Sequence, residues 1–143
     1  MITQPYRVLV TGSRDWTDEQ TLTGQLTALL AATTALGQTL TLIHGACPTG
    51  ADHQAEQWAR WHQQRGARIE IERHPAADHG PWPACGPIRN AHMVRLGADA
   101  CIAFIGPCTQ ATCKRPQPHG SHGASHCAHL AEAAGIPTRR WTS

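Results

Sequence analysis

The segment Val8-Leu9-Val10-Thr11-Gly12-Ser13-Arg14 joins a continuous apolar run to a glycine turn. An apolar run without polar interruption is typical of a strand that is buried on both faces of a parallel sheet. A glycine after such a strand allows a tight turn into a helix, and the amide groups at a helix start attract anions. We therefore expect 8–10 to be the first and central strand of an α/β fold, with a ligand site at its carboxyl end.

Strand and helix patterns alternate along the rest of the chain. Apolar runs at 40–43 and 101–105 predict two more buried strands, alternation at 68–72 predicts an edge strand, and Pro137 begins a terminal strand. Helical patterns lie between them, and Thr17 with Gln20 predicts a capping box at the start of the first helix. Since such alternation implies parallel pairing, the sequence predicts a Rossmann-like three-layer sandwich, with strand order about 3-2-1-4-5 and helices on both faces.

Length and composition indicate one domain over residues 1–143. The chain has 12 Lys+Arg against 10 Asp+Glu, and this small excess of positive charge is unlike that of a duplex nucleic-acid binder. The sequence shows neither an apolar stretch of the roughly 18 residues that a membrane span needs nor a leader pattern. We therefore expect a cytoplasmic protein without a membrane partner, in which the 6 cysteines are mostly reduced.

Glycine-bearing segments recur where strands or loops give way to helices, at 12–16, 45–52, 86–90 and 120–123. In open parallel sheets, ligands bind beyond the carboxyl ends of the strands, at the switch point between the first and fourth strands in this order. All of these segments are expected at that edge. The sequence therefore predicts one site for a nucleotide or a nucleotide-derived small molecule.

Two arginines in these segments are candidate phosphate ligands. Arg89 falls in the first turn of a predicted helix, where a cation is unfavourable unless an anion compensates it, and Arg14 follows the first strand. The alternative is that both arginines pair with Asp15, Asp52 or Asp78 and only tie loops together. Asp52 itself is expected either to accept from a ribose hydroxyl or to act only as a favourable charge at a helix start.

Several common nucleotide and hydrolase motifs are missing. No Gly-Lys-Ser/Thr follows Thr11-Gly12-Ser13, so the turn is not an ATPase P-loop, and Arg14 stands where a dinucleotide fingerprint needs a glycine. Ser13 as a nucleophile would need a base such as His44, and the sequence has no nucleophile-elbow pattern. These features weigh against ATPase, NAD-linked and serine-hydrolase chemistry.

A Cys/His-rich loop is expected at 106–123. Residues 108–127 contain three cysteines and three histidines, and thiolate with imidazole suits tetrahedral zinc. The predicted ligands are Cys108, Cys113 and His119, with Cys127 or His122 as the fourth. The alternatives are a disulfide between Cys108 and Cys113, or a flexible loop whose histidines face solvent or the ligand.

Three motifs occur in order along the chain: 10–16, His44-Gly45 with Gly50-Ala51-Asp52, and 86–90. Together they resemble the SLOG superfamily, which is named for the Smf/DprA and Lonely Guy proteins. The resemblance covers residues from about 7 to 141 and is closest to the small YspA-like branch of bacteria and phages. It implies a Rossmann-like fold that binds nucleotides or nucleotide-derived ligands, in some members as a sensor. By position, it implies that the ligand-binding residues are Gly12, Ser13, Arg14, Gly45, Gly50, Asp52, Arg89, Asn90 and Gly123.

The chain departs from the Lonely Guy enzymes, which hydrolyse the N-glycosidic bond of nucleoside monophosphates. These enzymes carry a Pro-Gly-Gly-x-Gly-Thr-x-x-Glu motif. When it is aligned with this chain, Gly123 and Ala124 stand at the Gly-Thr pair and Cys127 stands at the catalytic glutamate. A carboxylate stabilises the cationic sugar transition state, and a thiol does not supply that charge at neutral pH unless it is activated. Hydrolysis would need another group, such as His122 or His126.

Three functions are consistent with these features. The first is a sensor or binding domain for a nucleotide-derived ligand, which requires no cofactor. The second is a nucleoside monophosphate phosphoribohydrolase-like enzyme in which Asp52 or a loop histidine replaces the missing glutamate. The third is a zinc-stabilised module that binds protein or nucleic acid. The alanine-rich final helix is expected either to pair with a second copy, giving a homo-oligomer, or to pack closely on the sheet.

Overall fold

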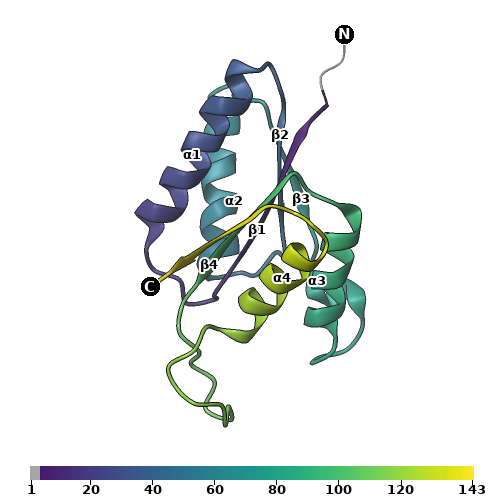
Figure 1. Ribbon diagram of the computed structural model, residues 1–143. Coiled ribbons are helices and arrows are strands. Elements are labelled where there is room, and N and C mark those ends of the chain that lie inside the picture. Colours follow the sequence, from purple (N-terminus) through teal and green to yellow (C-terminus); the bar gives the residue numbers. More distant parts are fainter. Residues whose placement is uncertain (1–3) are drawn as a thin grey trace.

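The computed structural model describes residues 4–143 and shows a parallel sheet with helices on both faces (Figure 1). The strand order is β3-β2-β1-β4-β5, which confirms the predicted order and the Rossmann-like α/β fold. The elements, in chain order, are β1 (Tyr6–Gly12), α1 (Glu19–Ala35), β2 (Leu40–His44), α2 (Gly50–Gln63), β3 (Ile69–Arg73), the short 3₁₀ helix η1 (Ala76–His79), α3 (Cys85–Leu96), β4 (Ala100–Ile105), α4 (His122–Ala133) and β5 (Thr138–Thr142).

The apolar run of β1 is buried because both faces of the sheet are covered. Successive strand residues point to opposite faces, so Val8 and Val10 pack in one core cluster and Leu9 in another. The first cluster contains Leu22 and Leu26 of α1 with residues of α2, and the second contains Met93 of α3 with residues of α4. Figure 1 accordingly shows α1 with α2 on one side of the sheet and α3 with α4 on the other.

β1 lies at the centre of the sheet, with Leu9 paired to Ile43 of β2 and to Cys101 of β4. The chain crosses from β3 to β4 on the other side of β1, so the switch point lies between β1 and β4. Because all strands are parallel, their carboxyl ends meet at one edge. The loops at this edge carry the predicted ligand residues.

Two local expectations need correction. The N-cap of α1 is Asp18 rather than Thr17, because the Asp18 carboxylate accepts from the backbone N–H of Thr21 at 3.1 Å. Helix α3 begins at Cys85, so Arg89, which was expected in the first turn of this helix, lies just past that turn. The edge strand at β3 agrees with the sequence, and α4 stops before Gly135, whose φ is 81°.

None of the helices within residues 4–143 combines the length and apolar character that a bilayer crossing requires.

Candidate functional site

The predicted segments meet at the carboxyl edge of the sheet through direct hydrogen bonds. The Ser13 carbonyl accepts from the backbone N–H of Ala51 at 3.2 Å, which joins the β1 turn to the start of α2. Arg89 Nη1 donates to the Gly45 carbonyl at 2.6 Å, which joins α3 to the turn after β2. Asn90 Nδ2 also lies 3.4 Å from the Gly123 carbonyl, which joins α3 to α4. Through these contacts, the four glycine segments are close neighbours.

Three of the glycines make room for other parts of the protein. A Cβ at Gly12 would lie 2.2 Å from Ala51 Cβ, and one at Gly45 would lie 2.4 Å from Arg89 Nη1. Gly50 has a φ of +72°, and a Cβ there would lie 2.2 Å from the Ser13 carbonyl oxygen. Contacts within the protein thus account for these three glycines without a ligand. Gly123 differs, because no other atom lies within 4 Å of a Cβ at that position.

Ser13 is a buried connector. Its Oγ accepts from the backbone N–H of Gly106 at 2.7 Å and lies 2.6 Å from Ser121 Oγ. The hydroxyl thereby joins the end of β1 to the loop after β4 and to the N-cap of α4. His44, the base considered for a serine nucleophile, is instead hydrogen-bonded to Glu56.

Arg14 and Trp82 face each other across loops that are distant in sequence. The Arg14 guanidinium carbon lies 5.8 Å from the ring centre of Trp82, and this indole is 74% exposed. Trp16, in the loop after β1, is only 4% exposed and packs against Phe104 in the core. Trp82 therefore provides an exposed aromatic ring near Arg14, and Trp16 is a core residue.

Arg89 is half-buried and held in place by three acceptors. Its Nη1 donates to the Gly45 carbonyl and to the His74 carbonyl at 3.3 Å, and its Nε donates to Asn90 Oδ1 at 2.8 Å. Within residues 4–143, neither Arg89 nor Arg14 forms an ion pair. The described residues thus give no support to the reading in which these arginines only pair with nearby aspartates.

Asp52 lies in the first turn of α2, next to the loop that follows β2. Its Oδ2 accepts from the backbone N–H of Cys47 at 3.2 Å, and the side chain is buried. Burial raises the pKa of Asp52 above its ordinary value, and the hydrogen bond from the Cys47 amide and the charge of Arg89 oppose this rise. A buried carboxyl group whose pKa is raised by burial and opposed by a nearby guanidinium charge is a combination that recurs at functional sites.

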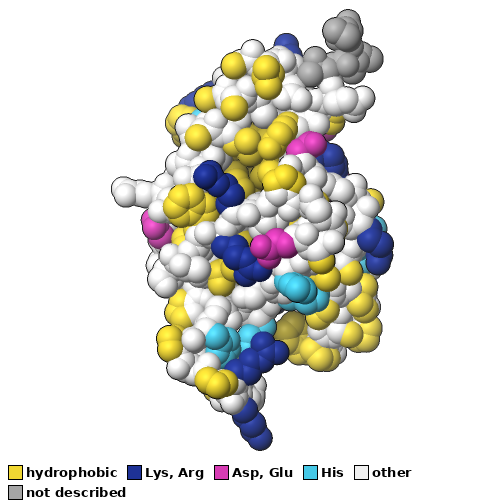
Figure 2. Space-filling view, in the orientation of Figure 1, with side chains coloured by type: hydrophobic (Ala, Val, Ile, Leu, Met, Phe, Trp, Pro, Cys, Tyr) yellow, Lys and Arg dark blue, Asp and Glu magenta, His cyan; other side chains and the backbone are white. Residues whose placement is uncertain are grey.

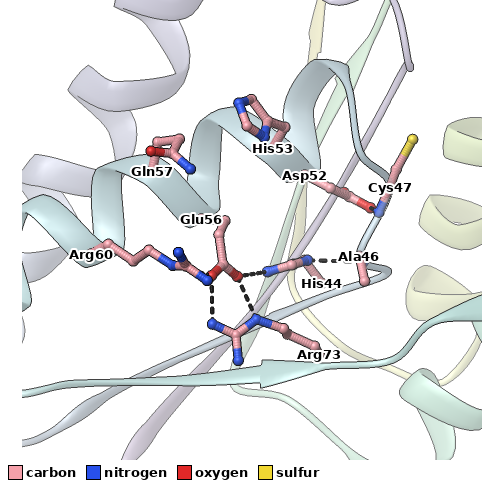
Figure 3. A pocket seen from close by; sticks show the side chains of 9 residues that line it. All are labelled: His44, Ala46, Cys47, Asp52, His53, Glu56, Gln57, Arg60 and Arg73. Atoms are coloured by element: carbon pink, nitrogen blue, oxygen red, sulfur yellow. Dashed lines mark hydrogen bonds and ion pairs between the residues drawn. The ribbon is translucent and has the colours of Figure 1, made fainter.

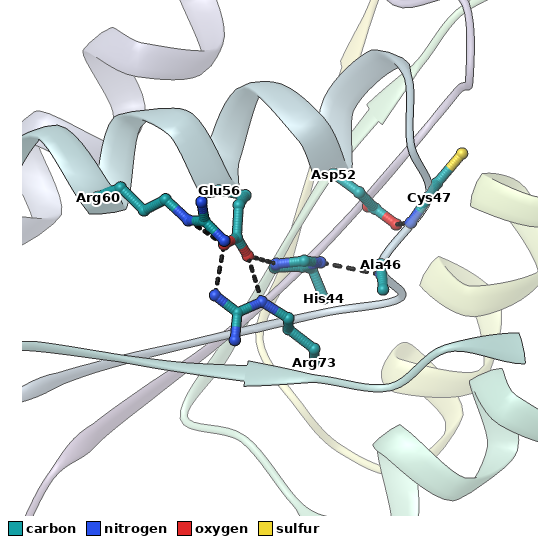
Figure 4. Close-up of polar contacts among 7 residues, drawn as sticks. All are labelled: His44, Ala46, Cys47, Asp52, Glu56, Arg60 and Arg73. Atoms are coloured by element: carbon teal, nitrogen blue, oxygen red, sulfur yellow. Dashed lines mark hydrogen bonds and ion pairs between the residues drawn. The ribbon is translucent and has the colours of Figure 1, made fainter. Parts of the chain in front are cut away.

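A polar cluster around Glu56 was not predicted from the sequence (Figures 3 and 4). Glu56 accepts from Arg60 Nε at 2.6 Å, from Arg73 Nε at 2.8 Å and from His44 Nε2 at 2.8 Å. His44 Nδ1 accepts from the backbone N–H of Ala46 at 2.9 Å, so the proton of the neutral ring is on Nε2. Burial alone would raise the pKa of Glu56, and the hydrogen bonds from Arg73, His44 and Arg60 lower it to about 2.

The Glu56 cluster borders a hollow of about 210 Å³ beside Asp52. Figure 3 shows side chains from β2, the turn after it, α2 and β3 around this space. Ala46, in the turn, has a φ of 58°, a left-handed conformation that is uncommon for a residue other than glycine. The spacing of Glu56 and Arg60, four residues apart on one helix face, was the sequence signal for part of this cluster. The hollow is lined by His44, Ala46, Cys47, Asp52, His53, Glu56, Gln57, Arg60 and Arg73.

The Cys/His loop brings Cys108, Cys113, His119 and His122 together. Cys127, which was given with His122 as a candidate for the fourth position, lies elsewhere. It is fully buried on α4 against Leu9 and its neighbours, and burial raises the pKa of its thiol to about 11. A second group, His74 with His79 and His92, was not predicted.

Comparison with known proteins identifies the family. Residues 6–77 match the model of the "YspA, cpYpsA-related SLOG family", and this match includes the Gly12, Gly45 and Gly50 turns. The chain is 37% identical over 132 residues to the Gene 61 protein of Mycobacterium phage D29, with 92% of each chain covered. No solved structure matches the chain significantly. On these two matches and the observed fold, the chain belongs to the YspA, cpYpsA-related SLOG family.

Proposed function

We propose that this protein binds a nucleotide-derived small molecule at the carboxyl edge of the sheet, around the turn at 45–52. The observation that carries the proposal is the state of Arg89. This guanidinium is half-buried on α3, just past the first turn of the helix, is fixed by backbone carbonyls, and forms no ion pair within residues 4–143. A half-buried guanidinium without a counter-ion is suited to charge-assisted hydrogen bonds with a ligand phosphate.

The surrounding groups suit the other parts of a nucleotide. The start of α4 is open at Gly123, where main-chain amides can donate to a phosphate. The Asp52 carboxyl group and the hollow beside it offer an acceptor and space for a sugar. The exposed ring of Trp82 offers a flat apolar surface on which a base can stack.

A binding screen tests the proposal. Purified protein is titrated by calorimetry with nucleoside mono- and diphosphates and with cyclic nucleotides derived from NAD. Arg89→Ala should weaken the binding of any hit by about 1.5–3 kcal/mol, since a charge-assisted hydrogen bond to phosphate is lost. Arg95→Ala is the matched control, because Arg95 is exposed in the last turn of the same helix.

Arg89 also contacts the Gly45 and His74 carbonyls, so the fold of each variant must be checked by thermal unfolding. If a folded Arg89→Ala protein binds the hit as tightly as the wild type, or if no compound in the library binds, the proposal is wrong.

Asp52 supports a second candidate function, that of a hydrolase. The raised pKa of the buried Asp52 carboxyl group favours its protonated form, which suits proton transfer, whereas burial raises the pKa of the Cys127 thiol to about 11 and keeps that thiol protonated near neutral pH. Incubation with nucleoside monophosphates should then release free base, and Asp52→Asn should abolish the release. Tight binding of a nucleotide without base release would exclude this candidate.

A further inference from the structure

Four ligand atoms from the loop between β4 and α4 converge at distances that a metal ion would impose. Cys108 Sγ lies 3.5 Å from His122 Nε2, and Cys113 Sγ lies 3.4 Å from both His119 Nε2 and His122 Nε2. The two Nε2 atoms are 3.2 Å apart, and all four atoms lie within 4.8 Å of one another.

These separations fit a tetrahedral zinc ion. With Zn–S bonds of about 2.3 Å and Zn–N bonds of about 2.0–2.1 Å, tetrahedral angles put neighbouring ligand atoms about 3.3–3.8 Å apart. The observed sulfur–nitrogen and nitrogen–nitrogen distances of 3.2–3.5 Å fall close to this range. Two thiolates and two neutral imidazoles would together cancel the charge of a divalent zinc ion.

The proton of His119 supports the same conclusion. Its Nδ1 lies 2.8 Å from the Pro116 carbonyl oxygen, which can only accept a hydrogen bond, so Nδ1 carries a proton. In the neutral ring, Nε2 then has a free lone pair, and this lone pair faces His122 Nε2 and Cys113 Sγ. A backbone carbonyl that accepts from the other ring nitrogen is the usual support of a metal-bound histidine.

The loop has little regular secondary structure and little buried surface of its own. Residues 106–121 form neither a helix nor a strand, apart from an isolated antiparallel bridge between Pro107 and Gly120. Most of the segment is exposed, and its one buried residue, Gly106, stands at its start. In Figure 2, histidine and Lys or Arg side chains gather at the lower end of the molecule, where Figure 1 draws this loop. A long polar loop with little buried apolar surface is a setting in which metal binding stabilises a single conformation.

From this geometry we infer that Cys108, Cys113, His119 and His122 form a structural zinc site that fastens the loop to the start of α4. The protein supplies all four ligands, so the site is closed and has no position for a substrate or a water molecule. Ser121, next to His122, contacts Ser13 at the end of β1. The zinc ion thereby also fixes one wall of the carboxyl edge.

The free cysteines and the choice of His122 over Cys127 as the fourth ligand are consistent with this assignment. Cys108 and Cys113 are both free thiols rather than a disulfide, and each faces at least one imidazole nitrogen. Cys127 is excluded as a ligand because it is buried in the core. His74, His79 and His92 form a second group of nitrogen donors, so an experiment must distinguish zinc bound by this group from zinc bound by the loop.

Metal analysis of protein purified with reducing agent tests the inference. We expect close to one zinc ion per chain in the wild type and nearly none in Cys113→Ser and His122→Ala. Cys47→Ser and His79→Ala are the matched controls, because Cys47 is a half-buried thiol outside the site and His79 belongs to the other histidine group. Both controls should keep their zinc. Zinc that is lost in His79→Ala and kept in His122→Ala would overturn the assignment, as would iron in place of zinc.

Two measurements on the wild type remain decisive if the ligand variants fail to fold. Cobalt(II) replacing zinc should give the intense visible bands of a tetrahedral thiolate site. Cys108 and Cys113 should resist alkylation until a chelator is added, with at least a tenfold change in modification rate. Absence of bound metal, rapid alkylation of both thiols without chelator, or a Cys108–Cys113 disulfide in peptide mapping would each overturn the inference.

Discussion

Asp52 combines a buried position with a group that prefers to be charged. Because burial raises its pKa, the ionised form is less favourable in the folded protein than in the unfolded chain. The Cys47 amide and the charge of Arg89 offset only part of this cost. A costly buried carboxyl group near an arginine that forms no ion pair within residues 4–143 is expected where binding, rather than stability, determines the residue.

The substitution Asp52→Asn should therefore stabilise the protein while it weakens ligand binding. Asparagine keeps an oxygen that can accept from the Cys47 amide and removes the buried charge. We expect the free energy of unfolding near neutral pH to rise by about 1 kcal/mol in urea denaturation. Because the raised pKa destabilises only the ionised form, the gain should shrink as the pH falls below the folded pKa of Asp52. A less stable variant at neutral pH would contradict this account of Asp52.

Among the residues of the site, the sequence indicated Arg89, Asp52 and the glycine turns, since each stands next to a strand end or a helix start. It could not show that Gly45 accommodates the Arg89 guanidinium, because that contact joins segments whose separation depends on how α3 packs. The same holds for Glu56, whose partners come from β2, α2 and β3. Side-chain partners across three elements follow from the assembled fold and have no local sequence pattern.

At the scale of elements, the end of β1 meets the start of α2 at a distance that Gly12 sets. A Cβ at this position would lie 2.2 Å from Ala51 Cβ and 2.9 Å from the Phe104 carbonyl oxygen. Gly12→Ala must therefore push β1, α2 or β4 apart, and we expect it to lower the free energy of unfolding by about 1–3 kcal/mol. Urea denaturation measures this change.

Gly24→Ala is the matched control for that substitution. Gly24 lies within α1, and no other atom lies within 4 Å of a Cβ there. Alanine should stabilise the helix by about 0.5–1 kcal/mol, because it loses less backbone entropy than glycine. Equal stability of Gly12→Ala and the wild type would mean that β1 and α2 do not meet as closely as the structure has them.

The strands were predicted better than the helix starts, and the reason is physical. Uninterrupted apolar runs have few alternatives to a strand buried on both faces, and this fixed β1, β2 and β4. Thr17 and Asp18 are both good N-cap residues, so the sequence alone could not choose between them. On α4, Cys127 shares the sheet-facing side with Ala124, Ala128 and Ala131, whereas His122 stands at the helix start beside the loop. Whether Cys127 or His122 can be a metal ligand therefore depends on which of the two faces the loop, and the sequence alone did not show this.

For the whole molecule, the sheet order and the edge that carries the site followed from alternating strands and helices. Alternation implies parallel pairing with crossover connections, and the observed order β3-β2-β1-β4-β5 agrees with this. The hollow beside Asp52 did not follow, because its walls depend on the Glu56 cluster. This cluster joins β2, α2 and β3, so it connects the edge of the sheet to a covering helix.

The Glu56 cluster should make the stability of the whole protein sensitive to acid. The folded pKa of Glu56 is about 2, below its ordinary value of 4.5. A carboxylate with a lowered pKa stabilises the folded protein fully above its unfolded value, and this contribution is lost as the pH falls toward the folded pKa. Glu56→Gln removes the charge and keeps a similar shape, so it should lower the free energy of unfolding near neutral pH by about 1–3 kcal/mol.

The difference between wild type and Glu56→Gln should stay constant down to a pH of about 5 and then decrease steadily toward a pH of about 2. Chemical denaturation at a series of pH values measures this decrease. Glu70→Gln is the matched control, because Glu70 is an exposed glutamate on β3 outside the cluster, and its effect should be small at every pH. A Glu56→Gln difference that does not change with pH would show that the three donors around Glu56 do not hold it ionised, and the cluster would then not be what joins α2 to the edge of the sheet.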